Sequence, residues 1–145
     1  MSQSVFDVIV IGAGPGGYVA AIRCAQLGLK TAIIEREHMG GICLNWGCIP
    51  TKAMLRSAEV FHLMHRANEF GLNAEKISFD LDAVIKRSRG ISKQLNQGVT
   101  HLLKKNKVKS FIGDATILDK GKVKVEKNDN SEELSCSNII IASGA

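Results

Sequence analysis

The sequence of 145 residues is poor in proline and aromatic side chains, with 2 Pro, 5 Phe, 1 Tyr and 1 Trp. It has no apolar segment suited to a membrane, since the run at residues 8–11 is far shorter than the ~20 residues that a spanning helix needs. Residues 1–7 lack a basic segment, and Asp7 interrupts the apolar stretch that a secretory signal requires. We therefore expect a cytoplasmic protein that does not enter the membrane.

The charge is close to balanced, at a formal +5, and the basic excess lies in the second half of the chain. Lysines gather at residues 104–109 and 120–124, and Phe111 is the only aromatic residue near them. Proteins that bind single-stranded nucleic acids interleave stacking rings with their basic groups. We therefore interpret the lysines as a solvated face and expect no nucleic-acid partner.

The composition, 45% hydrophobic and 23% charged, argues against disorder. A chain of this length buries roughly 68–70% of its unfolded surface, enough for one core. The prediction is one domain over residues 1–145.

The first elements form a β-α-β pattern. A β-branched apolar run at residues 5–11 predicts a buried strand, residues 15–27 predict a helix of small apolar side chains that Gly28 ends, and residues 31–35 predict a second buried strand. This spacing is typical of a parallel unit with a helical crossover.

The rest of the chain adds two helices and a run of short strands. Residues 51–66 predict a helix with Leu55, Ala58, His62 and His65 along one side, and a second helix runs to about residue 106 with Asp80 as its N-cap. Strands are expected at 108–112, at 115–118, 122–126 and 133–136 as an antiparallel meander, and at 138–142 as another buried strand. The fold class is α/β: a Rossmann-like parallel sheet with long helices and an antiparallel β-meander.

A glycine motif follows the first strand. Gly12, Gly14 and Gly17 fit G-x-G-x-x-G, in which the glycines permit a tight turn, close approach of a pyrophosphate and close packing of helix on sheet. Glu35 ends the second strand, where an acid accepts hydrogen bonds from ribose hydroxyls. The motif predicts a dinucleotide site and leaves NAD and FAD as alternatives.

Two of the four cysteines lie five residues apart, just before a helix. On an ideal helix the Cα atoms of Cys43 and Cys48 would be roughly 8.6 Å apart, too far for a disulfide, so the pair can form one only in an irregular turn, for which Gly47 supplies the freedom. A helix start stabilises the Cys48 thiolate, which favours a reversible disulfide. Lys52 is placed to reach a cofactor beside the thiols.

A metal site is the rival interpretation of these cysteines. Two cysteines at this spacing without a second pair are poor zinc ligands, so we expect no metal. Cys24 and Cys136 are expected to be small buried apolar residues.

With the glycine motif, Glu35 and the block at residues 40–52 in this order, the chain resembles the amino-terminal FAD domain of the pyridine nucleotide-disulfide oxidoreductases. The resemblance implies that Cys43 is the interchange thiol, that Cys48 contacts the flavin, and that Lys52 lies by the flavin ring. It further implies cofactor contacts from the glycine loop, Glu35 and the residues Gly41, Ala115, Ser143, Gly144 and Ala145. Ile42 and Trp46 depart from the usual Thr and Val of this block.

Leu44, Ile49 and Thr51 are more similar to the lipoamide enzymes of this family than to its glutathione or mercuric reductases. The resemblance then implies electron flow from dihydrolipoamide, carried on lipoyl domains of 2-oxo acid dehydrogenase complexes, through Cys43–Cys48 and FAD to NAD. It also implies a homodimer whose NAD-binding and interface domains are absent from this truncated chain, and a fragment that is inactive alone. The alternatives are a non-catalytic flavin- or nucleotide-binding fragment, an interaction module, or a related disulfide reductase.

Overall fold

The computed structural model describes residues 4–128 and 130–144. It opens with β1 (Ser4–Ile11), α1 (Pro15–Gln26) and β2 (Thr31–Glu35). The two strands pair in parallel, with Val8 opposite Thr31 and Ile11 opposite Ile34. The β-α-β pattern expected from the sequence is therefore confirmed.

One six-stranded sheet has the order β3-β2-β1-β6-β5-β4. It adds β3 (Lys109–Ile112), β4 (Asp114–Asp119), β5 (Lys122–Lys127) and β6 (Asn130–Ile141) to the first two strands. The strands β3, β2, β1 and β6 run parallel, whereas β4, β5 and β6 form the antiparallel meander. The α/β class with a parallel core and a meander is confirmed.

The strand β6 corrects two sequence predictions. The sequence predicts separate strands at 133–136 and 138–142, but β6 is continuous because it pairs with β1 across both segments, from Leu134 opposite Ser4 to Ile141 opposite Ile11. Its end is also not buried: Asn138 is exposed and Ile141 is 67% exposed. The helix α1 packs over β1 and β2, and Ile139 and Ile140 near the end of β6 are half-buried at the margins of the two core clusters.

The hydrophobic core lies on both faces of the central strands. On one face, Val10 and Ile33 pack with Val99 and Leu103 of the long helix α4 (Leu81–Lys105). On the other face, Ile9 packs with the meander side chains Val123 and Leu134, together with Phe6, Ala32, Ile34 and Val125. The meander thus covers the second face of the central strands, as the helices cover the first face.

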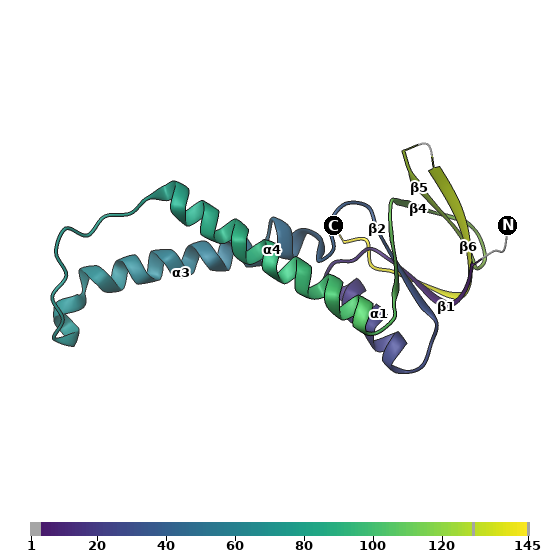
Figure 1. The fold of residues 1–145 in the computed structure, drawn as a ribbon, viewed down its shortest axis with the longest axis horizontal. Helices are drawn as coiled ribbons and strands as arrows, with labels where there is room; N and C mark the ends of the chain where they lie inside the picture. Colours follow the sequence, from purple (N-terminus) through teal and green to yellow (C-terminus); the bar gives the residue numbers. More distant parts are fainter. Residues whose placement is uncertain (1–3, 129, 145) are drawn as a thin grey trace.

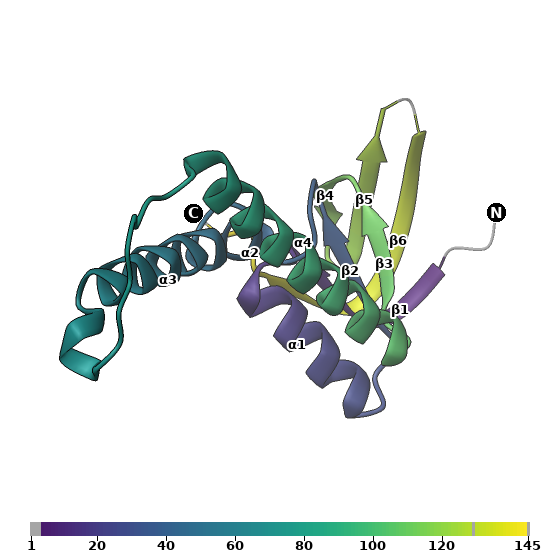
Figure 2. The same ribbon diagram turned by 60° about the vertical axis from the view of Figure 1, so that its left-hand side comes forward.

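Three further helical segments connect β2 to α4: α2 (Gly41–Asn45), α3 (Cys48–His65) and the short 3₁₀ helix η1 (Ala67–Phe70). Figures 1 and 2 show α3 running away from the sheet and α4 returning beside it, so that the two form an arm. Asp80 accepts a hydrogen bond from the N–H of Ala83 at 3.1 Å, which confirms it as the N-cap of α4. No helix within residues 4–128 and 130–144 is both long and apolar enough to cross a membrane.

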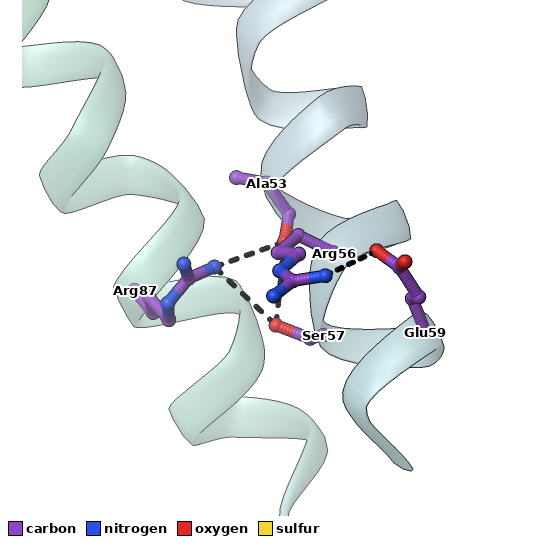
Figure 3. Close-up of polar contacts among 5 residues, drawn as sticks. All are labelled: Ala53, Arg56, Ser57, Glu59 and Arg87. Carbon is purple, nitrogen blue, oxygen red and sulfur yellow. Dashed lines mark hydrogen bonds and ion pairs between the residues drawn. The ribbon is translucent and has the colours of Figure 1, made fainter. Parts of the chain in front are cut away.

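Polar side chains hold α3 against α4. Arg87 donates hydrogen bonds to the carbonyl oxygen of Ala53 at 3.0 Å and to Ser57 Oγ at 3.4 Å, as Figure 3 shows beside the Arg56–Glu59 ion pair. Ser88, the next residue of α4, donates from its Oγ to the carbonyl oxygen of Pro50 at 3.2 Å. These contacts fix the position of the helix that begins with Cys48.

The buried faces of the arm differ from those that the sequence predicts. On α3, Pro50 and Ala53 are buried, whereas the predicted stripe is exposed: Leu55, Ala58, His62 and His65. On α4, the sequence predicts an apolar stripe with steps of three and four residues, and its members Ser88, Val99 and Leu103 are buried as expected. Ser92, outside that stripe, is also buried, while four members of the stripe are exposed: Leu81, Ile85, Leu95 and Leu102. Small residues let the two helices approach closely, so size outweighs hydrophobicity at this contact.

Candidate functional site

The loop after β1 contains glycines at positions where a larger residue would collide with neighbouring backbone. Gly12 has φ +95°, and a Cβ there would overlap the carbonyl oxygen of Ala142. A Cβ on Gly17 would overlap the carbonyl oxygen of Gly12, so α1 rests directly on the loop. A Cβ built on Gly14, the N-cap of α1, would meet no atom within 4 Å. The loop therefore presents bare backbone and the positive end of α1 to a cleft.

Glu35 ties the end of β2 to this loop. Its Oε2 accepts a hydrogen bond from the N–H of Ala13 at 2.8 Å, and its Oε1 accepts one from the N–H of Glu37 at 3.0 Å. A carboxylate has about four acceptor positions. Glu35 can thus order the loop and still accept hydrogen bonds from a ligand's hydroxyl groups.

A second glycine loop lies against the first. The N–H of Gly40 donates to the carbonyl oxygen of Ala13 at 2.8 Å. Gly41 has φ +58°, and a Cβ there would lie 2.8 Å from the Cα of Gly14. The backbone of the cysteine block is thereby held against the start of α1.

A disulfide joins Cys43 and Cys48, with the Cα atoms 4.7 Å apart. It spans the break between α2, which ends at Asn45, and α3, which begins with Cys48. Gly47 lies between them at φ −118° and ψ −109°, outside the helical region. The irregular turn that the sequence requires for this disulfide is confirmed.

Two adjoining hollows form the candidate site, with volumes of about 330 Å³ and 190 Å³. They share Gly12, Glu35, Arg36 and Ser143. The larger hollow, here called the cleft, is also lined by Gly14, Pro15, Glu37, His38, Gly41, Ile42, Cys43, Trp46, Ala142 and Gly144. The smaller hollow is also lined by Ile11, Ile34, Gly113, Asp114 and Ala115. Most of the site residues expected from the sequence thus lie around one continuous opening.

Some expected site residues lie elsewhere. In the part of the chain that the structure describes, Cys48 and Lys52 do not line either hollow, and both are exposed near the start of α3. Gly17 lies behind the loop, where it supports α1. Ala145 lies outside the described residues.

Sequence reasoning missed Arg36, Glu37 and His38, and did not assign Trp46 to the lining of the cleft. The first three follow β2, and ligands of open α/β sheets bind beyond the carboxyl ends of the strands. Their position directly after Glu35 could have indicated them. Trp46 stands out only as a departure from the usual block, and its place in the wall depends on the turn after α2.

The other two cysteines correct a prediction. Cys24 and Cys136 are half-buried rather than buried, and each packs at the margin of a core cluster. Burial raises the pKa of the Cys136 thiol. Among the described residues, no group of three His, Cys, Asp or Glu side chains is placed to hold a metal ion.

The family model described as "Pyridine nucleotide-disulphide oxidoreductase" matches residues 6–145, and the chain belongs to this family. Similar proteins include the dihydrolipoyl dehydrogenases of Zymomonas mobilis, 55% identical over 97% of this chain and 30% of the relative, and of Rhizobium etli, 59% identical over 88% of this chain and 27% of the relative. The dihydrolipoyl dehydrogenase of Mycobacterium tuberculosis H37Rv is 48% identical over 97% of this chain and 30% of the relative. The chain therefore spans about 30% of the length of these relatives.

The fold is also similar to that of a solved enzyme. The flavoprotein disulfide reductase RclA from Escherichia coli, solved as a Cu(II) complex, superposes with a TM-score of 0.81 over all of this chain and 29% of that chain. The sequence identity is 24%, so this likeness supports the fold alone.

Proposed function

We propose that the chain is the FAD-binding part of a dihydrolipoyl dehydrogenase and that it carries the redox-active disulfide of that enzyme. One observation supports this most directly: the glycine loop, Glu35 and Cys43 line a single cleft. The identity of 48–59% to dihydrolipoyl dehydrogenases supports the same branch of the family.

The residues of the cleft fit FAD. Gly14 and Gly41 line the cleft without side chains and so leave room for a pyrophosphate, and the start of α1 offers N–H groups to its charge. Glu35 would accept hydrogen bonds from the ribose, and Ala115 would lie by the adenine in the smaller hollow. Ser143 and Gly144 would approach the cofactor from the end of β6.

The disulfide would oxidise a dithiol substrate. A thiolate of dihydrolipoamide attacks one sulfur of Cys43–Cys48 and releases the other as a thiolate. The second substrate thiol then closes the ring of lipoamide, so the substrate loses two electrons and two protons, and Cys43 and Cys48 become thiols. When bound, FAD would accept these two electrons and transfer them to NAD.

Each cysteine has a different environment for this exchange. Cys43 lines the cleft and is half-buried, whereas Cys48 is exposed as the first residue of α3. A thiolate at Cys48 would be stabilised by the positive end of the 18-residue helix α3. In the proposed enzyme Cys43 exchanges with the substrate, Cys48 contacts the flavin, and Lys52 lies one turn further along α3.

The remaining parts of this proposal concern the whole enzyme. NAD would bind outside these 145 residues, the enzyme would act as a homodimer, and its substrate would be carried on lipoyl domains of 2-oxo acid dehydrogenase complexes. We place the enzyme in the cytoplasm.

Titration of the oxidised, flavin-free chain with dihydrolipoamide, without oxygen, tests the proposal. Two new thiols per chain should appear for each lipoamide formed, because only Cys43–Cys48 is oxidised. Cys24→Ser, which changes a cysteine outside the disulfide, should leave this exchange intact, whereas Cys43→Ser should abolish it. If dihydrolipoamide does not open a disulfide that a strong general reductant opens, the proposal is wrong.

A further inference from the structure

A separate hollow of about 310 Å³ lies behind Trp46, between α2 and α4. Its α4 wall consists of Arg89, Ser92, Lys93 and Asn96, and none of these residues lines the cleft. His38 and Trp46 form part of both walls. The hollow is therefore a neighbour of the flavin cleft with its own polar side chains.

Ser92 is the most unusual of these side chains. It is 4% exposed, and within residues 4–128 and 130–144 its Oγ has no hydrogen-bond partner. A buried hydroxyl without a partner costs free energy, so most such groups are paired. Ser88, one turn earlier, shows the ordinary outcome, since its Oγ donates to the carbonyl oxygen of Pro50. The Ser92 hydroxyl is therefore a buried donor without a partner among the described residues.

Two cations, Arg89 and Lys93, line the same hollow as Ser92. Arg89 is held in place by the hydrogen bond from its Nη1 to the carbonyl oxygen of Asn45 at 2.8 Å. A guanidinium carries five N–H groups, so this bond leaves donors for a ligand. Lys93 adds a second positive charge, and no Asp or Glu of the described residues lines the hollow.

The side chains of Asn45 and Asn96, which also line the hollow, already have hydrogen-bond partners within the protein. Asn96 Nδ2 donates to the carbonyl oxygen of Met39 at 2.5 Å and to Asn45 Oδ1 at 3.2 Å, and Asn45 Nδ2 donates to the carbonyl oxygens of Met39 and Gly41. This network connects the hollow to the loop that carries Gly41. The free donors that remain, from Arg89, Ser92 and Lys93, all suit an acceptor with negative charge.

We propose that Arg89, Ser92 and Lys93 bind a phosphate group, at a site separate from the flavin cleft. Arginine pairs with oxyanions through parallel N–H donors, and a phosphate has enough acceptor oxygens to satisfy the Ser92 hydroxyl as well. The phosphate group belongs either to the free ion or to a small phosphomonoester. The site does not rest on the proposed function, because none of its three ligand residues contacts the cleft.

Trp46 is the single tryptophan of the chain and reports directly on the site, since it lines the hollow and its ring centroid lies 5.0 Å from that of His38. Flavin-free protein would be titrated with inorganic phosphate and, in parallel, with glycerol 3-phosphate, with chloride at matched ionic strength as the reference. We expect a saturable change in Trp46 fluorescence and a higher Tm with phosphate, and no such change with chloride. Tighter binding of the ester would identify a phosphomonoester as the natural ligand, and tighter binding of the ion would identify free phosphate.

Three variants separate this site from the glycine loop, which also attracts anions near Trp46. Ser92→Ala should weaken phosphate binding about tenfold, because a hydrogen bond to a charged group is lost, yet leave the Tm in phosphate-free buffer unchanged or higher. Arg89→Gln should weaken binding at least as much. Lys86→Gln removes the same charge from an exposed position on α4 outside the hollow and should leave binding unchanged. Phosphate binding that survives Ser92→Ala and Arg89→Gln at full strength would place the anion at the glycine loop and overturn the proposal, as would an equal response to chloride.

Discussion

The carboxylate of Glu35 accepts a hydrogen bond from the backbone N–H of Ala13, 22 residues earlier, at 2.8 Å. The last residue of β2 thereby fixes the loop after β1. The sequence indicates Glu35 only as a partner for a ribose, whereas the structure gives it a second task in the protein itself.

This second task makes Glu35 important for stability without any ligand. In Glu35→Gln the amide has one carbonyl oxygen for two N–H groups, so either the half-buried N–H of Ala13 or the exposed N–H of Glu37 loses its partner. We expect a loss of about 1–3 kcal/mol in the free energy of unfolding, measured by urea denaturation. Glu37→Gln is the control, because the side chain of Glu37 is exposed and only its backbone takes part. Equal stability of both variants would show that these bonds contribute nothing.

Affinity for FAD should fall when the charge of Glu35 is reversed. Glu35→Lys removes the acceptors and places a donor against the ribose hydroxyls, so we expect FAD binding to weaken by about 1–3 kcal/mol. Equilibrium dialysis at several FAD concentrations measures this. An unchanged affinity would show that Glu35 does not contact the ribose.

Gly16 and Gly17 offer a matched pair on α1. A Cβ on Gly17 would overlap the carbonyl oxygen of Gly12, whereas a Cβ on Gly16 meets no atom within 4 Å. Gly17→Ala should therefore destabilise the fold by about 1–3 kcal/mol through overpacking. Gly16→Ala should stabilise it by about 0.4–1 kcal/mol, because alanine loses less entropy in a helix. Urea unfolding of the two variants measures both changes in stability. A loss of stability in Gly16→Ala would contradict the prediction that a Cβ is accommodated there.

The two cysteines of the disulfide should differ in their optical effect. With saturating FAD and a reductant, a thiolate in contact with the flavin gives a long-wavelength absorption band. We expect Cys43→Ser to retain this band and Cys48→Ser to lose it, because the proposed flavin contact belongs to Cys48. A band that persists in Cys48→Ser would assign the flavin contact to Cys43 instead. Cys43 is the alternative because its side chain belongs to the residue that lines the cleft.

Local patterns predict much of this molecule, and tertiary contacts account for what they miss. The strand, glycine loop, helix and Glu35 are each specified by residues near one another in sequence, and Asp80 is predicted as a cap for the same reason. The exposed stripe of α3 is mispredicted because periodicity identifies an apolar face but not its partner. Arg87 and Ser88 of α4 bond to the backbone of α3 at Ala53 and Pro50, and this contact decides which face is buried.

The site shows the same limit. Gly12, Gly14 and Cys43 are recognisable from spacing and Gly41 from the family resemblance, and the structure brings all four to one cleft. Arg36, His38 and Trp46 enter its wall because Gly40 and Gly41 turn the chain back against Ala13 and Gly14. No periodicity in the sequence encodes that turn, and only the fold shows which neighbours it creates.

The last prediction concerns the 145-residue chain on its own. The cleft and its neighbouring hollow have volumes of about 330 Å³ and 190 Å³, while Cys48 and Lys52, the expected neighbours of the flavin ring, are exposed. Sites for small ligands usually bury 70–90% or more of the ligand, so contacts to the adenosine side alone leave the ring in water. We therefore expect this chain to bind FAD weakly and to show no dihydrolipoamide-dependent reduction of NAD, although its disulfide still exchanges with the dithiol. The chain would be mixed with FAD, freed of unbound flavin by gel filtration and assayed, with the zero-flavin sample as control. Stoichiometric flavin after filtration would refute weak binding, and measurable turnover would show that these residues suffice for the complete electron path.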